Sequence, residues 1–357
     1  MKEALERHIF GLVPGAVGLD LEATGTRVRV SVEQGRAAVA LALGYPLDPD
    51  STRLLRTSIE EVVRADGLQL ASLDLGTRIQ AHAVQPNVAP LPRVRNIIAV
   101  GSGKGGVGKS TTAVNLALAL AGAGAKVGVL DADVYGPSVP MMLGLSGRPD
   151  SPDGKSIEPM RAHGVEAMSI GLLVDQDTPM IWRGPMATSA LTQLLTETLW
   201  GDLDYLIVDL PPGTGDIQLT LAQKIPVAGA VIVTTPQDIA TLDARKALKM
   251  FEKLQIPVLG LVENMAVHVC SQCGHAEHLF GRGGGERMAA QYGIPLLGSL
   301  PLQLEIREQG DAGIPIVAAA PGSDAASAYR NTALRMSALL AARPRAAMPI
   351  ASSLLAG

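Results

Sequence analysis

Residues 101–111 read Gly-Ser-Gly-Lys-Gly-Gly-Val-Gly-Lys-Ser-Thr, and no other segment constrains the fold as strongly. The segment satisfies the pattern G-x-x-x-x-G-K-[ST]. It directly follows the apolar run 97–100 and leads into a helix-compatible segment at 111–121. A strand, a glycine-rich loop and a helix in this order form a phosphate-binding loop, in which backbone N–H groups and the helix N-terminus surround phosphate oxygens. The chain is therefore expected to contain a nucleotide-binding α/β domain.

Short, almost entirely apolar runs recur along the chain from this point, as is typical of strands buried on both faces of a parallel sheet. They are Ile97–Val100, Val127–Leu130, Tyr205–Val208, Ala230–Val233, Val258–Val262 and Leu296–Leu300. Helix-compatible segments such as Met186–Leu199 and Leu242–Leu254 lie between them. This alternation predicts a doubly wound, mostly parallel α/β sheet of the P-loop NTPase type.

A smaller α/β unit precedes that domain. Arg27–Val32 and Ala37–Leu43 alternate apolar and other residues as half-buried strands do, and Thr52–Asp66 has helical spacing. Prolines are concentrated in the next segment, where they disfavour both helix and central strand. We therefore expect a small α/β domain at 1–85, a proline-rich linker at 86–95, the P-loop ATPase domain at 96–342 and a flexible tail at 343–357.

Composition excludes several classes of protein. The chain has 357 residues, enough for about two domains with cores of their own. A net charge of −4 and 3% aromatic residues argue against a dedicated nucleic-acid binder. Two cysteines exclude a disulfide scaffold and favour a reducing compartment. The N-terminus lacks the pattern of a signal peptide, and no apolar run is long enough for a membrane span, so we expect a cytoplasmic protein without a membrane partner.

The phosphate-loop motif predicts roles for individual residues. Lys109 is expected to neutralise β- and γ-phosphate charge, and the Ser110 hydroxyl to ligate Mg²⁺. The expected nucleotide-binding residues of the loop are Gly103, Lys104, Gly105, Gly106, Val107, Gly108, Lys109, Ser110 and Thr111.

Acidic residues follow two of the predicted strands, at the sheet edge where α/β proteins bind ligands. Asp131 and Asp133 follow 127–130, and Asp209 follows 205–208. A lone Asp at a strand end is more often a turn or cap residue, but a phosphate loop nearby favours a catalytic role. We expect Asp133 to position or deprotonate the attacking water, Asp131 to support the metal site and Asp209 to act as the Mg²⁺ acid.

The two cysteines form a C-x-x-C pair, Cys270 and Cys273, with histidines on either side. A tetrahedral zinc site or a cubane cluster needs four ligands, and one chain supplies two thiolates. Four interpretations remain open from the residues alone. Nearby histidines could complete a zinc site, the pair could be a redox couple, two subunits of a symmetric dimer could share one 4Fe–4S cluster, or the thiols could be unliganded.

The phosphate loop resembles a specific class. A second lysine early in the loop, Lys104, is a mark of the MinD/ParA-like ATPases with a deviant phosphate loop. That resemblance implies a homodimer around two ATP molecules, in which Lys104 reaches the partner subunit's nucleotide as a catalytic residue. Asn264, after the strand 258–262, matches an Asn that contacts adenine in related sites.

Further motifs narrow the resemblance. In order, the chain carries Gly-Lys-Gly-Gly-Val-Gly-Lys-Ser-Thr, Asp-Ala-Asp-Val-Tyr-Gly-Pro-Ser, Trp-Arg-Gly-Pro-Met, Val-Asp-Leu-Pro-Pro-Gly-Thr-Gly-Asp, Glu-Asn-Met, Cys-x-x-Cys-Gly-His and Phe-Gly-x-Gly-Gly-Gly-Glu. Over about residues 95–340 it resembles the Mrp (ApbC-like) iron–sulfur cluster carrier ATPases. This resemblance favours the shared cluster, held by Cys270 and Cys273 of each subunit.

Other segments are less specific. Residues 1–85 resemble the small iron–sulfur-assembly domain of many bacterial members but contain no cysteine. Trp182–Pro185 fits either a cap for the following helix or a dimer or client surface. The glycines at 281–285 are expected to lead into a helix, with a hinge as the alternative.

The leading hypothesis is a homodimeric, Mg-ATP-dependent carrier that receives a 4Fe–4S cluster from an assembly scaffold and passes it to apo-proteins, without a nucleic-acid partner. The alternatives are a positioning ATPase of the MinD/ParA type and a reductase-type electron carrier. Members of the positioning class that bind membranes end in a basic amphipathic helix, and the tail 344–357 has no such pattern.

Overall fold

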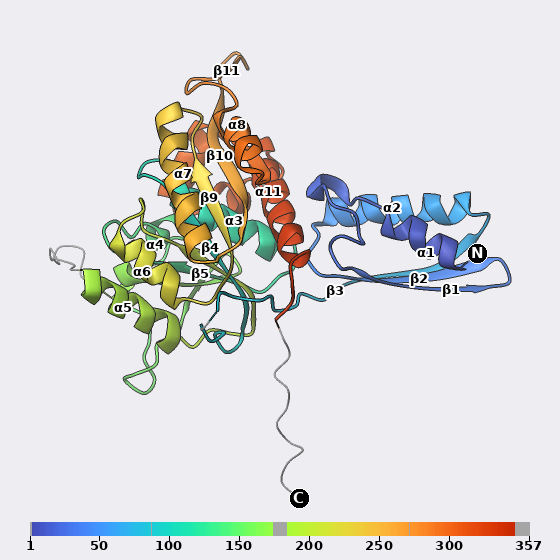
Figure 1. Ribbon diagram of the computed structural model, residues 1–357, viewed down its shortest axis with the longest axis horizontal. Helices are drawn as coiled ribbons and strands as arrows, with labels where there is room; N and C mark the ends of the chain where they lie inside the picture. The colour runs from blue at the N-terminus through green and yellow to red at the C-terminus, as the bar shows by residue number, and fades with distance from the viewer. Residues whose placement is uncertain (1, 87, 174–183, 271, 347–357) are drawn as a thin grey trace, which may run out of the picture.

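A computed structural model describes residues 2–86, 88–173, 184–270 and 272–346. Trp182 and Arg183 of the Trp-Arg-Gly-Pro motif lie outside the described residues, as does most of the expected tail. The described residues form two sheets, one of three strands and one of nine, and Figure 1 shows how they are arranged.

The three-stranded sheet lies in the N-terminal part of the chain, which we call the small unit. Its elements are α1 (Lys2–Phe10), a 3₁₀ turn (Gly15–Val17), β1 (Arg27–Glu33), β2 (Arg36–Leu43), α2 (Pro49–Ala65) and β3 (Gln69–Thr77). β1 and β2 form an antiparallel hairpin around Gln34 and Gly35, whose φ angles of 48° and 75° suit a two-residue turn. α2 then carries the chain over to β3, which pairs parallel to β2, and α1 and α2 cover one face of the sheet (Figure 1).

The nine-stranded sheet forms the large unit. Its strands are β4 (Val94–Ser102), β5 (Val127–Asp131), β6 (Met160–Ala162), β7 (Val165–Ser169), β8 (Leu203–Asp209), β9 (Val227–Thr234), β10 (Val258–Val269), β11 (Ala276–Glu277) and β12 (Leu296–Leu302). Their order is β11-β10-β9-β4-β8-β5-β7-β6, with β12 also paired to β10. All pairs are parallel except β10 with β11 and β6 with β7.

Helices cover both faces of this sheet. They are α3 (Lys109–Gly122), α4 (Val139–Met142), α5 (Gly184–Glu197), α6 (Asp216–Lys224), α7 (Asp238–Lys253), α8 (Gly284–Tyr292), α9 (Leu304–Asp311), α10 (Ile316–Ala319) and α11 (Asp324–Ala341), with a 3₁₀ turn at Ile170–Leu172. α3 and α11 share one core with the sheet, and α5, α6 and α7 share the core on the other face. The doubly wound, mostly parallel α/β fold is confirmed, and every predicted apolar run lies within a strand.

α11 joins the two units. Tyr329 and Met336 are buried in the core that α11 shares with α3. Leu334, Ala338 and Ala341, on another side of the same helix, are buried in the core of the small unit. One helix therefore contributes to both hydrophobic cores, and the small unit packs directly on the large one.

The segment between the units also makes specific contacts. Gln85 is buried; its Nε2 donates to the carbonyl oxygens of Ala222 and Ile225, and its Oε1 accepts from the Val227 N–H. β4 begins at Val94, two residues before the expected start of the ATPase domain at 96. These contacts hold the connecting chain against the end of α6 and the start of β9.

Candidate functional site

The phosphate loop connects β4, at the centre of the sheet, to α3, which begins at Lys109. Its glycines allow close approaches that a side chain would prevent. A Cβ on Gly103 would lie 2.1 Å from the Asp243 carbonyl carbon in α7, and a Cβ on Gly108 would lie 2.2 Å from Asn264 Nδ2. Gly106 and Gly108 also have φ near +78°, a conformation that glycine adopts without strain. The loop is thus packed against α7 and β10.

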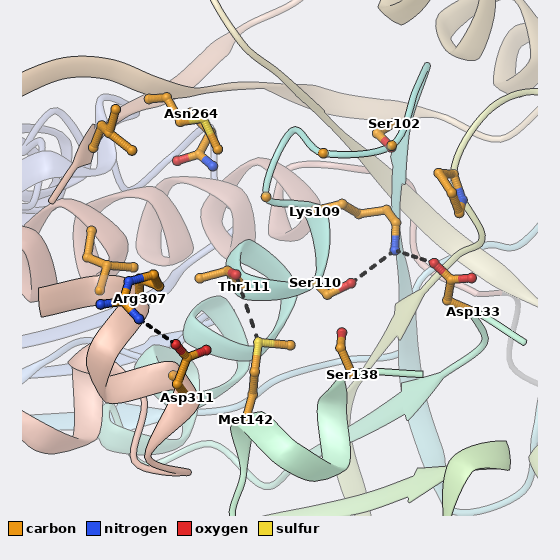
Figure 2. A pocket seen from close by; sticks show the side chains of 18 of the residues that line it. Ser102, Lys109, Ser110, Thr111, Asp133, Ser138, Met142, Asn264, Arg307 and Asp311 are labelled. Carbon is orange, nitrogen blue, oxygen red and sulfur yellow. Dashed lines mark hydrogen bonds and ion pairs between the residues drawn. The ribbon is translucent and has the colours of Figure 1, made fainter. Parts of the chain in front are cut away.

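Lys109 lies at the centre of a buried cluster of charges. Its Nζ is 2.5 Å from Asp209 Oδ1 and 3.8 Å from Asp133 Oδ2, and it donates to Ser110 Oγ at 3.3 Å. Figure 2 shows the Lys109 side chain between those of Ser110 and Asp133, and all three line the same pocket. β4, β5 and β8 are neighbours in the sheet, so their carboxyl ends place the loop and the acids together.

The three acidic side chains differ in what they contact. Asp131 is fully buried, and its two oxygens accept from the N–H groups of Asp133 and Val139 and from Ser169 Oγ. Asp131 therefore holds the following loop in place. Burial, reinforced by the charge of Asp209, raises the pKa of Asp131 to about 7.

Asp133 and Asp209 face the phosphate loop. Burial raises the pKa of both, although the nearby charge of Lys109 counteracts this. Asp209 Oδ2 is buried and has no hydrogen-bond partner among the described residues. Mg²⁺ prefers oxygen ligands, and this carboxylate oxygen, the Ser110 hydroxyl and Asp133 provide them within one cluster, so the residues present fit the ion.

A cavity of about 550 Å³ opens beside the loop, a size typical of small-molecule sites. Asn264 lies on its wall, where its Nδ2 donates to the Val107 carbonyl oxygen at 2.9 Å. Met265 follows with φ of 57°, and the pairing of β10 with β12 is interrupted between Glu263 and Val267. β10 is therefore kinked at the point where it contacts the phosphate loop.

Most residues on the rest of the cavity wall were not predicted from the sequence. Met141, Met142, Arg307, Asp311 and Tyr329 line the cavity from α4, α9 and α11. Met142, Arg307 and Asp311 are labelled in Figure 2. Arg307 Nη1 and Asp311 Oδ2 form an ion pair at 2.8 Å on this wall. These residues come from segments far apart in the chain and belong to no motif, so only the fold shows that they lie together.

Lys104 is set apart from the buried cluster. It is half-buried, and its side chain forms no ion pair with a described residue, whereas its carbonyl oxygen accepts from Ser102 Oγ at 2.9 Å. Gly105 beside it is exposed and lies next to Pro212, in the loop that follows Asp209. A role for Lys104 in a partner's site stays a prediction.

The cysteines lie at the tip of a hairpin formed by β10 and β11, which projects beyond the rest of the sheet (Figure 1). The Cys270 N–H donates to the His275 carbonyl oxygen, and the Gly274 N–H donates to that of Cys270. Cys270 is half-buried and Cys273 is exposed. Hydrogen bonds from the backbone N–H groups of Cys273 and Gln272, and from the Cys273 thiol, lower the pKa of Cys270. The turn therefore stabilises a thiolate.

The surrounding histidines do not complete a metal site. His268 Nδ1 donates to the Leu302 carbonyl oxygen, and His278 Nδ1 to that of Ala266. Among the described residues, no three His, Cys, Asp or Glu side chains are grouped so that they could hold a metal ion. The structure thus gives no support to a zinc site within one chain.

The glycine run at 281–285 leads into α8, as expected. A Cβ on Gly284 would lie 2.0 Å from the Pro236 carbonyl oxygen, and the Gly285 N–H donates to the buried Glu263 Oε1 at 2.7 Å. These glycines allow α8 to begin in contact with the ends of β9 and β10. In the described part of the chain, no helix is long and apolar enough to span a membrane.

Comparisons with known proteins agree with this geometry. Residues 93–337 match a family model described as ParA, NUBPL iron-transfer P-loop NTPase. An iron–sulfur cluster carrier protein of Pseudomonas fragi is 61% identical over 271 residues, which cover 75% of this chain and 94% of the relative. One of Deinococcus radiodurans is 43% identical over 350 residues, 98% of each chain. A solved structure of an Archaeoglobus fulgidus nucleotide-binding protein with ADP superposes with a TM-score of 0.55 at 40% identity, covering 62% of this chain and 87% of that one.

Proposed function

Because the chain belongs to the ParA family of NUBPL-type iron-transfer P-loop NTPases, we propose that it is an iron–sulfur cluster carrier that uses ATP hydrolysis to control cluster transfer. The cluster is the cargo, and apo-proteins that need it are the recipients. The observation that carries the proposal is the exposed hairpin with two thiols and no third ligand of its own chain among the described residues.

Two copies of the hairpin meet the ligand requirement of one cubane cluster. A 4Fe–4S cluster takes four thiolates, and a two-fold axis through the hairpin tips would bring together Cys270 and Cys273 of both subunits. The lowered pKa of Cys270 supports this role, since the thiolate is the form that binds metal. We therefore propose a homodimer as the loaded carrier.

The nucleotide site supports ATP hydrolysis in the same dimer. Water attacks the γ-phosphorus, an O–P bond forms, and the bond to the ADP oxygen breaks. Asp133 positions this water and accepts its proton, a task that its raised pKa favours. Lys109 leaves Asp209 to neutralise phosphate charge, and Lys104 stabilises the transition state in the partner's site. Ser110 and Asp209 would hold Mg²⁺, which when bound would supply positive charge to the phosphates.

An exposed apolar surface supports the subunit contact around this site. Ile239 and Leu242 lie in the first turns of α7, the helix that contacts Gly103, and are 66% and 47% exposed. Tyr135, two residues after Asp133, is 66% exposed. Large apolar side chains exposed beside a nucleotide site suit an interface that closes over the nucleotide.

β10 connects the nucleotide cavity to the cysteine hairpin. Asn264 and Met265 line the nucleotide cavity, and Cys270 directly follows the end of the same strand. At roughly 3.3 Å per residue, the two sites lie about 20 Å apart along the strand. A change in the kink at Asn264 would therefore move the hairpin, which is how we propose that hydrolysis switches the carrier between holding and releasing the cluster.

The small unit, residues 1–85, contains no cysteine, so it does not hold the cluster through thiolates. We propose that it forms a domain joined by the linker at 86–95 to the ATPase domain at 96–342, with a tail at 343–357. Its direct packing on α11 supports a role in orienting the ATPase domain toward partners.

Anaerobic reconstitution tests the cluster site. Wild-type protein should take up about one 4Fe–4S cluster per dimer, measured as iron, sulfide and native mass. Cys270→Ala and Cys273→Ala should each abolish uptake, whereas His275→Ala, a control in the same turn, should retain it. A stable cluster in both cysteine variants would refute the proposal, and loss of uptake in His275→Ala would favour a ligand set that includes histidine.

A second experiment tests the switch. Lys109→Ala, loaded with cluster, should lose ATP turnover and cluster transfer to an apo-ferredoxin while keeping its iron content. Unimpaired transfer by this variant would show that hydrolysis does not control release.

A further inference from the structure

A second, much smaller cavity lies where the small unit, the connecting chain and the end of α11 meet. The residues that line it include Gly25, Arg27, Gly44, Arg78, His82 and Arg345. None of these residues lines the nucleotide cavity or belongs to the cysteine hairpin. We call it the arginine cavity.

Its walls carry positive charge only. Arg27, Arg78 and Arg345 line the cavity, and no Asp or Glu is among the described residues that do so. None of these three arginines forms an ion pair with a described residue. In contrast, most of the ion pairs among the described residues are formed by other arginines. Like charges that line one cavity repel, and a bound anion would offset this repulsion.

The position of Arg345 is fixed by the backbone. Ala346 N–H donates to the Ala81 carbonyl oxygen, Ala83 N–H donates to that of Pro344, and Arg345 forms an antiparallel bridge with His82. The Arg345 guanidinium donates through Nη2 to the Gly25 carbonyl oxygen at 3.2 Å. The C-terminal end of the described chain is therefore tied to the connecting segment, and it carries the guanidinium across to the small unit.

Small residues leave room for this guanidinium. A Cβ on Gly25, whose φ is +64°, would lie 3.0 Å from Arg345 Nη2. Ala42 and Gly44 form the neighbouring wall. His82 is buried and donates from Nδ1 to Asn96 Oδ1, and burial, together with the charge of Arg345, lowers its pKa. The positive charge of the cavity thus comes from the arginines.

We propose that the arginine cavity binds an oxoanion, the carboxylate or phosphate group of a small ligand, and that the bound anion holds the small unit, the connecting segment and the end of α11 together. Guanidinium groups recognise both anions through paired hydrogen bonds. The cavity interior is about 10 Å³, roughly the space of one water molecule, so one anion oxygen enters it. The exposed arginine side chains then contact the remaining oxygens at the mouth.

Isothermal titration calorimetry tests this site in the full chain, with Mg-ADP added in excess so that the phosphate loop is occupied. Inorganic phosphate is titrated in one series and succinate in another, at constant ionic strength set with chloride. Saturable binding in either series is expected, and the series that binds more tightly identifies the class of anion.

Three variants decide whether the arginine cavity is responsible. Arg78→Gln and Arg345→Gln should each weaken binding about tenfold or more, since each loses a charge-assisted hydrogen bond. Arg343→Gln, an exposed arginine close in sequence that does not line the cavity, should bind as wild type does. Unchanged ATP turnover and circular dichroism confirm that the variants fold. Absence of saturable binding of both anions, or equal affinity in wild type, Arg78→Gln and Arg345→Gln, would overturn the proposal.

Discussion

Replacing Lys109 by Met removes the cation from a buried cluster of carboxylates. Lys109 is 6% exposed and Asp209 is fully buried, and their charged atoms are 2.5 Å apart. Asp131 and Asp133 lie in the same cluster. Methionine has nearly the shape of the lysine stem, so the substitution removes the charge with little change in packing.

The expected loss of stability depends on pH. Removing one partner of a buried ion pair costs about 3–5 kcal/mol when the other partner stays ionised. Burial raises the pKa of all three carboxyls, to about 7 for Asp131, and Lys109 counteracts this for each of them. An acid whose pKa is higher in the folded than in the unfolded state stabilises the fold when protonated, and this stability is lost as the pH rises through the folded pKa. The penalty of Lys109→Met should therefore be small at pH 5.5 and full at pH 8.

Thermal unfolding without nucleotide and with EDTA measures the effect. At about 2–4 °C per kcal/mol for a domain of this size, the midpoint should fall by roughly 6–20 °C at pH 8. The fall should be several-fold smaller at pH 5.5. Lys104→Met, on the same loop but outside the buried cluster, should change the midpoint by about 2 °C or less. Adding Asp209→Asn to Lys109→Met should recover part of the loss at pH 8.

Equal destabilisation of Lys109→Met at both pH values would refute this reasoning, because it would show that ionised carboxylates are not the source of the penalty. The reasoning would also be refuted if adding Asp209→Asn to Lys109→Met did not reduce the loss of stability at pH 8.

Two further predictions concern packing. Gly103→Ala should abolish ATP turnover and destabilise the protein by about 1–3 kcal/mol, because its Cβ would lie 2.1 Å from the Asp243 backbone. Gly122→Ala is the control, because a Cβ there would meet nothing within 4 Å apart from its own chain neighbours and helix backbone, and it should be neutral or slightly stabilising in urea unfolding. Wild-type turnover in Gly103→Ala would contradict the close packing of the loop on α7. Leu334→Ala should cost about 2–5 kcal/mol, since Leu334 is 1% exposed in the core of the small unit, and a change below about 1 kcal/mol would contradict that shared core.

The sequence predicts those parts of the fold that depend on local patterns. The phosphate loop needs only its own residues and the adjoining strand and helix, and the apolar runs identify strands buried on both faces. β3 is not predicted in this way, because its pairing with β2 shifts between Ala37 and Ala38. As a result, Leu70 and Leu73 lie three positions apart in the sequence rather than two. A bulge of this kind breaks the alternation by which half-buried strands are recognised.

The candidate site likewise combines residues that motifs identify with contacts that depend on the whole fold. Motifs identify Lys109, Asp133 and Asp209, and the fold brings them within contact of one another. No motif indicates that Asp131 is fully buried and bound to backbone N–H groups, because that depends on how Ser169 and Val139 pack around it. The arginine cavity combines residues from both ends of the chain, and only the three-dimensional fold places them together.

Because α11 contributes to two cores, its sequence should differ in relatives that consist of the ATPase part alone. Leu334, Ala338 and Ala341 are buried in the core of the small unit, which covers them. In a chain that lacks this unit, the same positions of the last helix would face water, and selection for solubility would replace them with polar residues. The identity of those three residues in a related sequence should therefore reveal whether a small unit is packed there, even when its own sequence is too divergent to recognise.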